Sequence, residues 1–210
     1  MKAYIFLYGK GSKTEVYRTH HDLTRIPGDT VICANGGYRT ARSVSIEPQI
    51  VVGDLDSLQD GEIGGGIEIR RYPPEKDYSD FELALTEARR LAADEVFVYG
   101  ALGGRKDHEI INLAVTAHAG LPITLIEETV EIHNVVKTLE ITGKKGRVCS
   151  LVAFFKGCRV GHMEGFRYTL ENEELRPSSR GLSNVIECNR ALISIARGSL
   201  FVIIPAAGNL

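Results

Sequence analysis

The sequence predicts an α/β protein in two parts: a mostly parallel, Rossmann-like three-layer α/β domain, then an all-β domain of the sandwich or barrel type. Short apolar runs alternate with helical patterns in the first half, and glycine-rich or acidic loops follow several of these runs. Long helical periods stop after about residue 128. Alternating strands and helices are typical of a parallel sheet covered on both faces. We therefore expect domains at residues 1–128 and 129–210.

Six apolar runs in the first half are expected to be strands, because Val, Ile, Phe and Tyr fill them with little polar alternation. They are Ala3–Tyr8, Thr30–Ala34, Gln49–Val52, Ile67–Arg71, Glu95–Tyr99 and Ile123–Ile126. In a sheet of this kind, ligands bind at the carboxyl ends of the strands. The loops after these runs are therefore the first place to look for a site.

Two helices are expected between the strands. The clearer one runs from about Asp80 to Ala93, and Ser79 with Glu82 forms a capping box in front of it. One apolar stripe follows its length, made of Phe81, Ala84, Leu85, Ala88 and Leu91. The other helix starts near Asp107 and carries Ile110, Ile111, Ala114, Val115 and His118.

The second half reads as short strands joined by turns that contain Gly and Asn, which is typical of an all-β domain. The expected strands are Glu131–Val136, Thr138–Thr142, Val148–Phe155, Arg159–Met163, Phe166–Leu170, Ala191–Ala196 and Ser199–Ile204.

Composition argues against several classes of protein. The formal net charge of -2 does not suit a protein that binds nucleic acid by neutralising many phosphates. The apolar run after Met1 and Lys2 is too short for a signal peptide or a membrane span. The four cysteines form no C-x-x-C pair. We therefore expect a cytoplasmic protein with reduced cysteines and small-molecule partners, bound to neither nucleic acid nor membrane. The cysteines are Cys33, Cys149, Cys158 and Cys188.

Three acidic clusters follow predicted strands, around Asp54, Asp77 and Asp107. Carboxylates gathered at one sheet edge repel each other unless a hard cation joins them, and Mg²⁺ holding a polyphosphate suits that arrangement. Asp54 and Asp56 are two residues apart, so both can face one ion from an extended loop. Taken alone, this cluster could equally be an Asp-rich turn exposed to solvent.

The second cluster brackets the start of the clearer helix. Acidic residues are common at a helix N-terminus for structural reasons alone. Ser79 already serves as the cap, however, which leaves Asp80 free to point outward. A helix N-terminus also suits phosphate oxygens, and Lys76 can supply a counter-charge.

The third cluster follows a glycine loop, Gly100 to Arg105. Its glycines allow backbone N–H groups to approach a phosphate closely, and Arg105 adds a fork suited to phosphate. The loop matches neither the Walker pattern nor G-x-G-x-x-G, and a tight turn is the structural alternative. Asn35, Gly36 and Gly37 repeat the strand–glycine–helix order.

Five segments in this order resemble the successive signatures of the thiamine pyrophosphokinase family, from about residue 30 to the C-terminus. The resemblance implies an α/β domain followed by a β-sandwich, and homodimers with active sites at the subunit interface. The implied reaction transfers the terminal pyrophosphate of ATP to the hydroxyl of thiamine, giving thiamine diphosphate and AMP. The segments are Ala34-Asn35-Gly36-Gly37, Gly53-Asp54-Leu55-Asp56-Ser57, Lys76-Asp77-Tyr78-Ser79-Asp80-Phe81-Glu82-Leu83-Ala84, Gly103-Gly104-Arg105-Lys106-Asp107-His108 and Gly181-Leu182-Ser183-Asn184.

By this resemblance, each group of residues has an expected role. Mg²⁺ is expected on Asp54, Asp56 and Asp80. The nucleotide is expected near Asn35, Gly36 and Gly37, and thiamine near Ser183 and Asn184 of the β domain. Asp77 or Asp107 could act as a general base. The ATP phosphates are expected to meet Ser57, Lys76, Asp77, Arg105, Asp107 and His108.

Two positions depart from the family pattern, and two rival functions stay open. Asn35 stands where the family usually has Asp, and Val185 where an acidic residue is frequent. These departures leave room for a nucleotide- or thiamine-binding sensor without turnover. The other rival is an Asp-x-Asp phosphatase with Asp54 as nucleophile, although Ser57 and Leu58 fit that class poorly.

Overall fold

The computed structural model describes residues 1–9, 14–59 and 61–206, which form two compact units. Unit 1 comprises Met1–Asn112 and Leu125–Glu128. Unit 2 comprises Leu113–Thr124 and the described residues from Thr129 onward. Residues 113–124, which the sequence assigned to the first domain, thus group with unit 2. The boundary at residues 128 and 129 stays a prediction.

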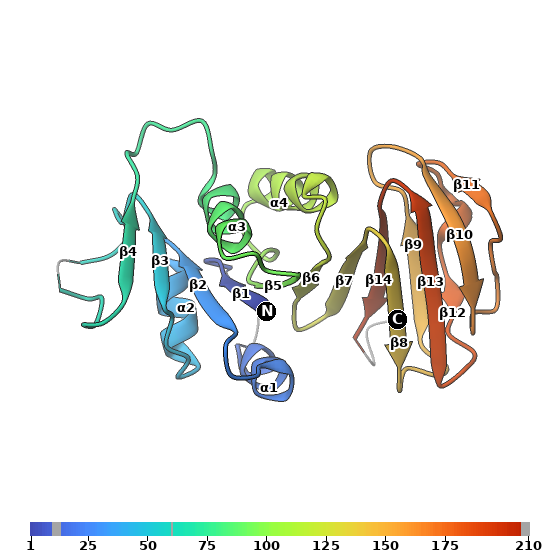
Figure 1. Ribbon diagram of the computed structural model, residues 1–210, viewed down its shortest axis with the longest axis horizontal. Coiled ribbons are helices and arrows are strands. Elements are labelled where there is room, and N and C mark those ends of the chain that lie inside the picture. The colour runs from blue at the N-terminus through green and yellow to red at the C-terminus, as the bar shows by residue number, and fades with distance from the viewer. Residues whose placement is uncertain (10–13, 60, 207–210) are drawn as a thin grey trace. The chain divides into compact units, whose positions relative to one another are not determined.

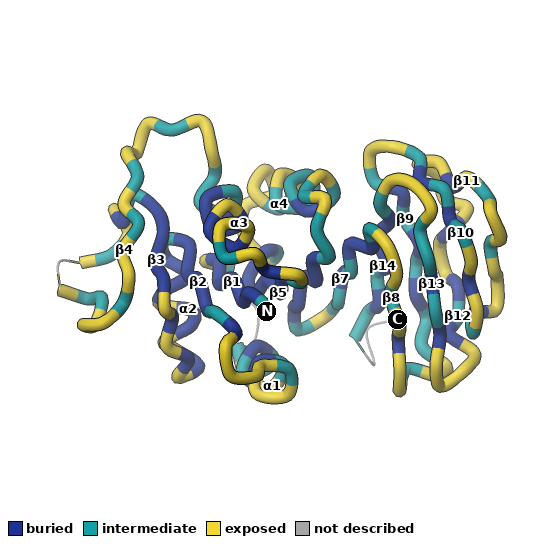
Figure 2. Tube along the Cα trace, in the orientation of Figure 1, coloured by how far each residue is buried: buried dark blue, intermediate teal, exposed yellow. Residues whose placement is uncertain are grey.

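Unit 1 is built on a parallel sheet (Figure 1). Its strand order is β6-β5-β1-β2-β3-β4, and the pairings of β1 with β5 and β2, of β2 with β3 and of β3 with β4 are all parallel. Figure 2 shows buried residues concentrated along the inner strands. The strands are β1 (Lys2–Phe6), β2 (Thr30–Ala34), β3 (Ile50–Gly53), β4 (Glu68–Arg71), β5 (Glu95–Tyr99) and β6 (Ile123–Ile126).

Helices cover both faces of this sheet. Tyr4 and Phe6 of β1 pack in one core cluster with Tyr17 of α1 and Tyr38 of α2. Because side chains alternate along a strand, Ile5 points to the opposite face, and α3 packs there against β1, β2 and β3. The predicted three-layer α/β arrangement is confirmed. The helices are α1 (Glu15–Thr24), α2 (Gly37–Ser43), α3 (Asp80–Arg90) and α4 (Lys106–His118).

The capping box predicted at the start of α3 is present. Glu82 N donates to Ser79 Oγ at 3.3 Å, and Ser79 N donates to Glu82 Oε2 at 2.8 Å. Four of the five residues of the predicted apolar stripe are buried, and Leu91 lies just beyond the helix as its C-cap. The helix ends at Arg90 rather than Ala93, because Ala92 adopts a left-handed conformation at φ 55°.

Helix α4 begins where the sequence indicated, but its apolar residues behave differently. Ile110 and Ile111 are 58% and 50% exposed, and Thr116 is the buried residue of this helix. Helix α1 was not predicted, because polar residues obscure its periodicity. Helix α2 was implied only by the strand–glycine–helix order at residues 35–37, without bounds. No helix of the described residues is both long and apolar enough to cross a bilayer.

Unit 2 is a sandwich of two antiparallel sheets, with strand orders β12-β9-β14-β7 and β11-β10-β13-β8. Leu151 and Val202 of the first sheet share one core cluster with Val160 and Ile193 of the second. This packing decides between sandwich and barrel. The strands are β7 (Val130–Val135), β8 (Thr138–Thr142), β9 (Val148–Val152), β10 (Cys158–Glu164), β11 (Glu173–Leu175), β12 (Asn184–Val185), β13 (Arg190–Arg197) and β14 (Leu200–Pro205).

One predicted strand of unit 2 is wrong. Residues 166–170 form only an isolated bridge between Phe166 and Ile186. The chain bends just before it at Gly165, whose φ is +80° and whose missing side chain would lie 2.6 Å from Arg190 O. The short strands β11 and β12 and the 3-10 turn Ser179–Gly181 were not predicted.

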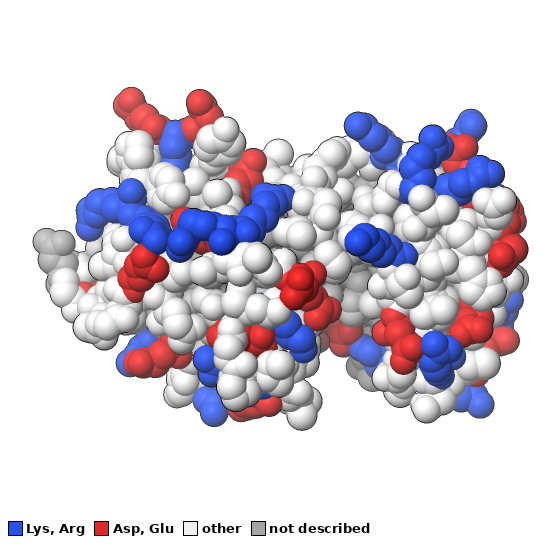
Figure 3. Space-filling view, in the orientation of Figure 1, with Lys and Arg blue, Asp and Glu red and all other residues white. Residues whose placement is uncertain are grey.

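Charged side chains of both signs lie next to each other on the visible face of unit 2 (Figure 3). Among the ion pairs of unit 2, Arg190 is 2.9 Å from Glu140 and Arg167 is 2.9 Å from Glu187. All four cysteines are free thiols; Cys188 is exposed and the other three are buried.

Candidate active site

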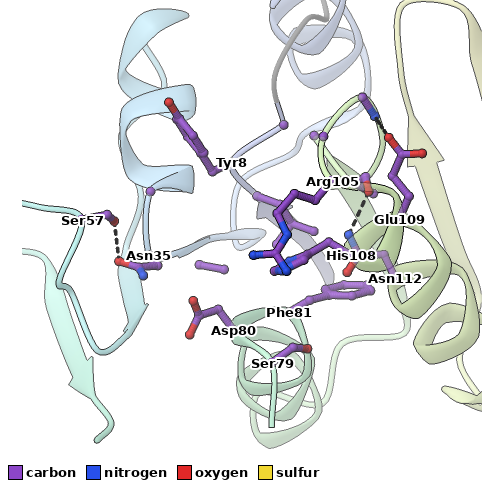
Figure 4. A pocket seen from close by; sticks show the side chains of 18 of the residues that line it. Tyr8, Asn35, Ser57, Ser79, Asp80, Phe81, Arg105, His108, Glu109 and Asn112 are labelled. Atoms are coloured by element: carbon purple, nitrogen blue, oxygen red, sulfur yellow. Dashed lines mark hydrogen bonds between the residues drawn. The ribbon is translucent and has the colours of Figure 1, made fainter. Parts of the chain in front are cut away.

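A pocket of about 830 Å³ opens in unit 1, at the carboxyl ends of its parallel strands. Its wall comes from the loops after β1, β2, β3 and β5, from the segment before α3 and from the first turns of α4. Figure 4 shows Asn35, Asp80 and Arg105 pointing into one space from three of these segments. The parallel sheet thus brings together residues that lie far apart in the chain.

Glycine is required at the base of this pocket, because backbone segments touch there. A side chain at Gly37 would place its Cβ 1.9 Å from Phe6 O. A side chain at Gly100 would lie 2.6 Å from Leu7 O, and one at Gly9 would lie 2.7 Å from Gly100 Cα. These glycines therefore let the loops after β1, β2 and β5 pack tightly under the ligand space.

Asn35 holds the first acidic cluster together. Its Nδ2 donates to Asp54 Oδ1 at 3.0 Å and to Asp56 Oδ1 at 3.1 Å, and its Oδ1 accepts from Ser57 Oγ at 2.7 Å. Asn35 has a φ of 47° and Leu55 a φ of 65°, both in the left-handed region. This backbone turns both carboxylates toward one amide. The loop is therefore turned at Leu55 rather than extended, and a shared ion stays a prediction.

Lys76 joins the first acidic cluster to the second. Its Nζ lies 3.3 Å from Asp54 Oδ2 and 3.1 Å from Asp80 Oδ1. Burial opposes ionisation of Asp54, but hydrogen bonds from Asp56 and Lys76 outweigh it and lower the pKa of Asp54. Burial likewise works against the charge of Lys76, but Asp80 and Asp54 raise its pKa. Asp54 and Lys76 are therefore both ionised at neutral pH.

The side chains of Asp54, Asp56 and Asp80 have the chemistry that a hard divalent cation requires. Their donors are all oxygens, as Mg²⁺ prefers. Asp80 Oδ1 is buried and accepts no hydrogen bond of good geometry from any described residue, although Lys76 lies beside it. Within the described part of the chain, no three His, Cys, Asp or Glu residues already form a metal cluster. Asn35 and Lys76 lie between the carboxylates instead, so a cation would have to replace Lys76.

The opposite wall is the glycine loop between β5 and α4. Leu102 N donates to Glu127 Oε1 at 2.9 Å, and Gly103 N donates to Glu109 Oε1 at 2.8 Å. Arg105 forms a two-point pair with Asp107, at 3.1 and 2.5 Å, and its side chain is 75% exposed. The hydrogen bond from Arg105 outweighs the opposing effect of burial and lowers the pKa of Asp107 to about 2.

The pocket wall includes many of the residues that the sequence singled out. Asp54 and Asp56 border it through their contacts with Asn35 and Lys76. Asp77 and Asp107 do not line it, and Gly37 lies beneath it. The predicted residues in the wall are Asn35, Gly36, Ser57, Lys76, Asp80, Arg105 and His108.

Ser183 and Asn184 belong to unit 2 and are absent from this wall. Asn184 is buried; its Oδ1 accepts from Tyr168 N at 3.0 Å and from Val185 N at 2.8 Å, and its Nδ2 donates to Tyr168 O at 2.7 Å. Ser183 N donates to Ser150 Oγ at 3.2 Å. Asn184 therefore shapes its own loop, and a contact with thiamine stays a prediction.

Several lining residues escaped the sequence analysis, among them Tyr8, Glu109 and Asn112. Tyr8 is 58% exposed, and its ring lies against Gly36, where an added Cβ would be 3.2 Å from Tyr8 Cγ. Glu109 and Asn112 lie on α4, and Asn112 Nδ2 donates to Ala101 O at 2.8 Å. The glycine after β1 could have indicated Tyr8, and helical spacing from His108 could have indicated Asn112.

Comparison with known proteins yields one family for both halves of the chain. The family model of the thiamin pyrophosphokinase catalytic domain matches residues 27–125, and that of the thiamin pyrophosphokinase vitamin B1 binding domain matches residues 132–200. Thiamine pyrophosphokinase of Bacillus subtilis is 26% identical over 179 residues, which cover 80% of this chain and 83% of that protein.

Solved structures share the fold. The thiamine pyrophosphokinase structure from Bacillus subtilis superimposes with a TM-score of 0.78 at 22% identity, covering 98% of this chain and 99% of that one. The enzyme from Geobacillus thermodenitrificans gives a TM-score of 0.78 at 21% identity and covers 100% of both chains. With both family domains matched in order along its sequence, this chain belongs to the thiamin pyrophosphokinase family of enzymes.

Proposed function

We propose that the protein transfers the terminal pyrophosphoryl group of ATP to the hydroxyl of thiamine, giving thiamine diphosphate and AMP. One observation carries this proposal within the family assignment. A single pocket has carboxylates bridged by Lys76 on one wall and the glycine loop with Arg105 on the other. A polyphosphate with its cation needs both kinds of wall, since it combines negative oxygens with a hard positive ion.

The phosphates of ATP would lie between Arg105 and Lys76. Arg105 is exposed enough to turn from Asp107 toward a phosphate, and its fork suits two phosphate oxygens. The ammonium of Lys76 would likewise turn toward a phosphate oxygen, giving up one of its carboxylate contacts. Ser57 and His108 are further donors on the pocket wall. Asn35 and the backbone of Gly36 would face the nucleotide beside them.

Asp54, Asp56 and Asp80 would hold Mg²⁺, on the strength of their all-oxygen chemistry and the buried Oδ1 of Asp80. When bound, the ion supplies neutralisation of the charge spread over the phosphate oxygens. Asn35 would keep Asp54 and Asp56 aimed at one point, because its amide already holds an oxygen of each.

In the reaction, the thiamine oxygen attacks the β-phosphorus of ATP in line. The new bond joins that oxygen to the β-phosphorus. The bond from the β-phosphorus to the oxygen that bridges it to the α-phosphorus breaks, and AMP leaves with the electron pair. The hydroxyl proton leaves to a base or to water. Asp107, with a pKa near 2, is too weak a base at neutral pH, so it would orient Arg105. Asp77 keeps the role of candidate base.

Thiamine itself would meet unit 2. The family model of the vitamin B1 binding domain spans residues 132–200, a range that contains Ser183 and Asn184. Since Asn184 is used by its own loop, Ser183 offers the freer side chain for a direct contact.

We further propose a homodimer with active sites at the subunit interface. Ile110 and Ile111 of α4 are 58% and 50% exposed. They share the first turns of that helix with His108 and Asn112, which line the pocket. A partner covering the isoleucines would therefore lie beside the site. Light scattering should give twice the chain mass, and Ile110→Glu should give monomers.

We also propose that the protein works in the cytoplasm. Its four cysteines are free, and the thiol of Cys188 is exposed. An exposed thiol suits a reducing compartment. Fractionation of the source cells should recover the protein with cytoplasmic markers, and recovery in an oxidising compartment would contradict this location.

A nucleotide-product assay tests the function. We expect AMP, and its formation should require both thiamine and a divalent cation. Formation of ADP alone, or AMP formation that ignores thiamine, would refute the proposal. Calorimetric binding of both substrates without any product would indicate a sensor. Release of inorganic phosphate from simple monoesters would instead favour an Asp-x-Asp phosphatase.

A further inference from the structure

A carboxylate already lies on the glycine loop where the nucleotide phosphates are proposed to bind. Gly103 N donates to Glu109 Oε1 at 2.8 Å, and Lys106 Nζ donates to Glu109 Oε2 at 2.8 Å. The Glu109 side chain is 15% exposed, and both Glu109 and Gly103 line the pocket. The hydrogen bond from Lys106 holds the pKa of Glu109 below its usual range; burial opposes this shift, and the loop N–H groups add to it. The loop therefore holds a negatively charged oxygen of the protein itself.

A phosphate oxygen competes for the same donor. Carboxylate and phosphate oxygens are both charged acceptors, and one N–H group cannot fully serve two of them. The loop is otherwise open, since a Cβ added at Gly104 would meet no described atom within 4 Å. Glu109 lies in the first turn of α4 and has a flexible side chain, so rotation about its side-chain bonds can move the carboxylate away from the Gly103 N–H group.

We propose that Glu109 is a displaceable internal anion, which holds the Gly103 N–H group until a phosphate oxygen of the nucleotide takes its place. Glu109 then leaves the loop together with Lys106 as an ion pair. The inference rests on the proposed function, because it needs the loop to be the phosphate site. It makes Glu109 a selectivity residue: a weakly charged ligand cannot displace an ion-paired carboxylate, whereas a polyphosphate can.

Calorimetry with inorganic tripolyphosphate, at constant Mg²⁺ and ionic strength, tests this on the full chain. Removing a like charge a few ångströms from the bound phosphate should tighten binding about tenfold in Glu109→Gln and Glu109→Ala. Glu75→Gln is the matched control, since it removes an exposed charge next to Lys76 in the chain. Its affinity should change by less than about twofold. Unchanged or weaker binding in both Glu109 variants would overturn the inference, because Glu109 would then only support the loop.

The Gly103 amide provides a readout that general electrostatics does not move. In ligand-free Glu109→Ala protein, the amide proton NMR signal of Gly103 should shift upfield from its wild-type position, because its hydrogen bond to the Glu109 carboxylate is lost. Tripolyphosphate should move that signal back downfield. In the wild type, tripolyphosphate should shift the carboxyl carbon signal of Glu109. A Glu109 signal that ignores saturating tripolyphosphate would also overturn the inference.

The nucleotide-product assay separates this inference from the proposed function. If the wild type makes AMP but the Glu109 variants bind tripolyphosphate no more tightly, only the internal-anion role fails. If no AMP forms but both variants bind tripolyphosphate about tenfold more tightly, the role stands and the proposed reaction fails. Glu109→Gln keeps the size of the side chain, so the test does not depend on Glu109→Ala folding.

Discussion

Lys76 lies four residues before Asp80, in the loop that leads into α3, and its ammonium is 3.1 Å from Asp80 Oδ1. The same ammonium is 3.3 Å from Asp54 Oδ2, on a loop 22 residues away. Both Lys76 and Asp54 have side chains that are about one-eighth exposed, at 12% and 13%. One ammonium group therefore contacts two carboxylates from different segments of the chain, and this shared contact is the basis of the first prediction.

Lys76→Met should leave a folded protein that turns over slowly. Loss of one positioned charge at the phosphates is expected to lower kcat/KM about 100-fold. Without the ammonium, Asp54 and Asp80 repel each other, so Mg²⁺ alone should bind more tightly, which calorimetry measures. Lys156→Met is the control, because Lys156 is an exposed lysine of unit 2. Full activity in Lys76→Met would remove Lys76 from the site.

Asn35→Asp should make the fold depend on divalent cations. The change removes a donor to Asp54 and Asp56 and adds a third negative charge beside them. We expect a loss of about 1–3 kcal/mol in the free energy of unfolding without Mg²⁺. Mg²⁺ should raise the melting temperature more in this variant than in the wild type.

Asn172→Asp is the matched control for that change. Asn172 has a similar backbone, at φ 49°, and its Oδ1 accepts from Arg159 Nε, an interaction that Asp keeps. Its melting temperature should not respond to Mg²⁺. An equal response in the two variants would show that Asn35 does not organise the acidic cluster.

Gly37→Ala should be severely destabilising, because the new Cβ would lie 1.9 Å from Phe6 O and backbone would have to move. We expect a loss of more than about 4 kcal/mol in the free energy of unfolding, measured with urea. Gly64→Ala, where a Cβ meets no described atom within 4 Å, should stay within about 0.5 kcal/mol of the wild type. Similar losses in both would contradict the tight packing of β1 against α2.

Unit 2 should lose stability in acid through Glu131. Burial opposes its ionisation, but His133 and Lys144 outweigh burial and lower the pKa of Glu131 from 4.5 to about 2. The folded state therefore binds fewer protons, so this contribution is complete above pH 4.5 and fades as pH falls toward 2. Urea unfolding from pH 6 to 3 should give a flatter pH profile for Glu131→Gln. An unchanged slope would exclude Glu131 as a source of acid sensitivity.

The strands and motifs of unit 1 were predictable because their signals are local. Apolar runs such as Glu95–Tyr99 are buried on both faces and show no competing pattern, so the predicted and observed bounds agree. The capping box is likewise local, because it depends only on Ser79 and on Glu82 three residues later. The bounds of helix α2 were not predictable, because its seven residues begin with a glycine that is there for close packing, not for helix formation.

The sequence by itself determined that acidic and glycine-rich loops end the strands of an α/β domain, and that an all-β domain follows. It determined this because strand period, caps and loop chemistry depend on neighbours in the chain. Only the tertiary structure decided which charges face each other. The contact of Lys76 with Asp54 joins two separate loops that lie 22 residues apart. No spacing along the chain encodes it, because it arises when the sheet brings its loops to one edge. The contacts of Lys76 with Asp80 and of Glu109 with Gly103 are closer in sequence, but they depend on side-chain directions that the tertiary structure sets.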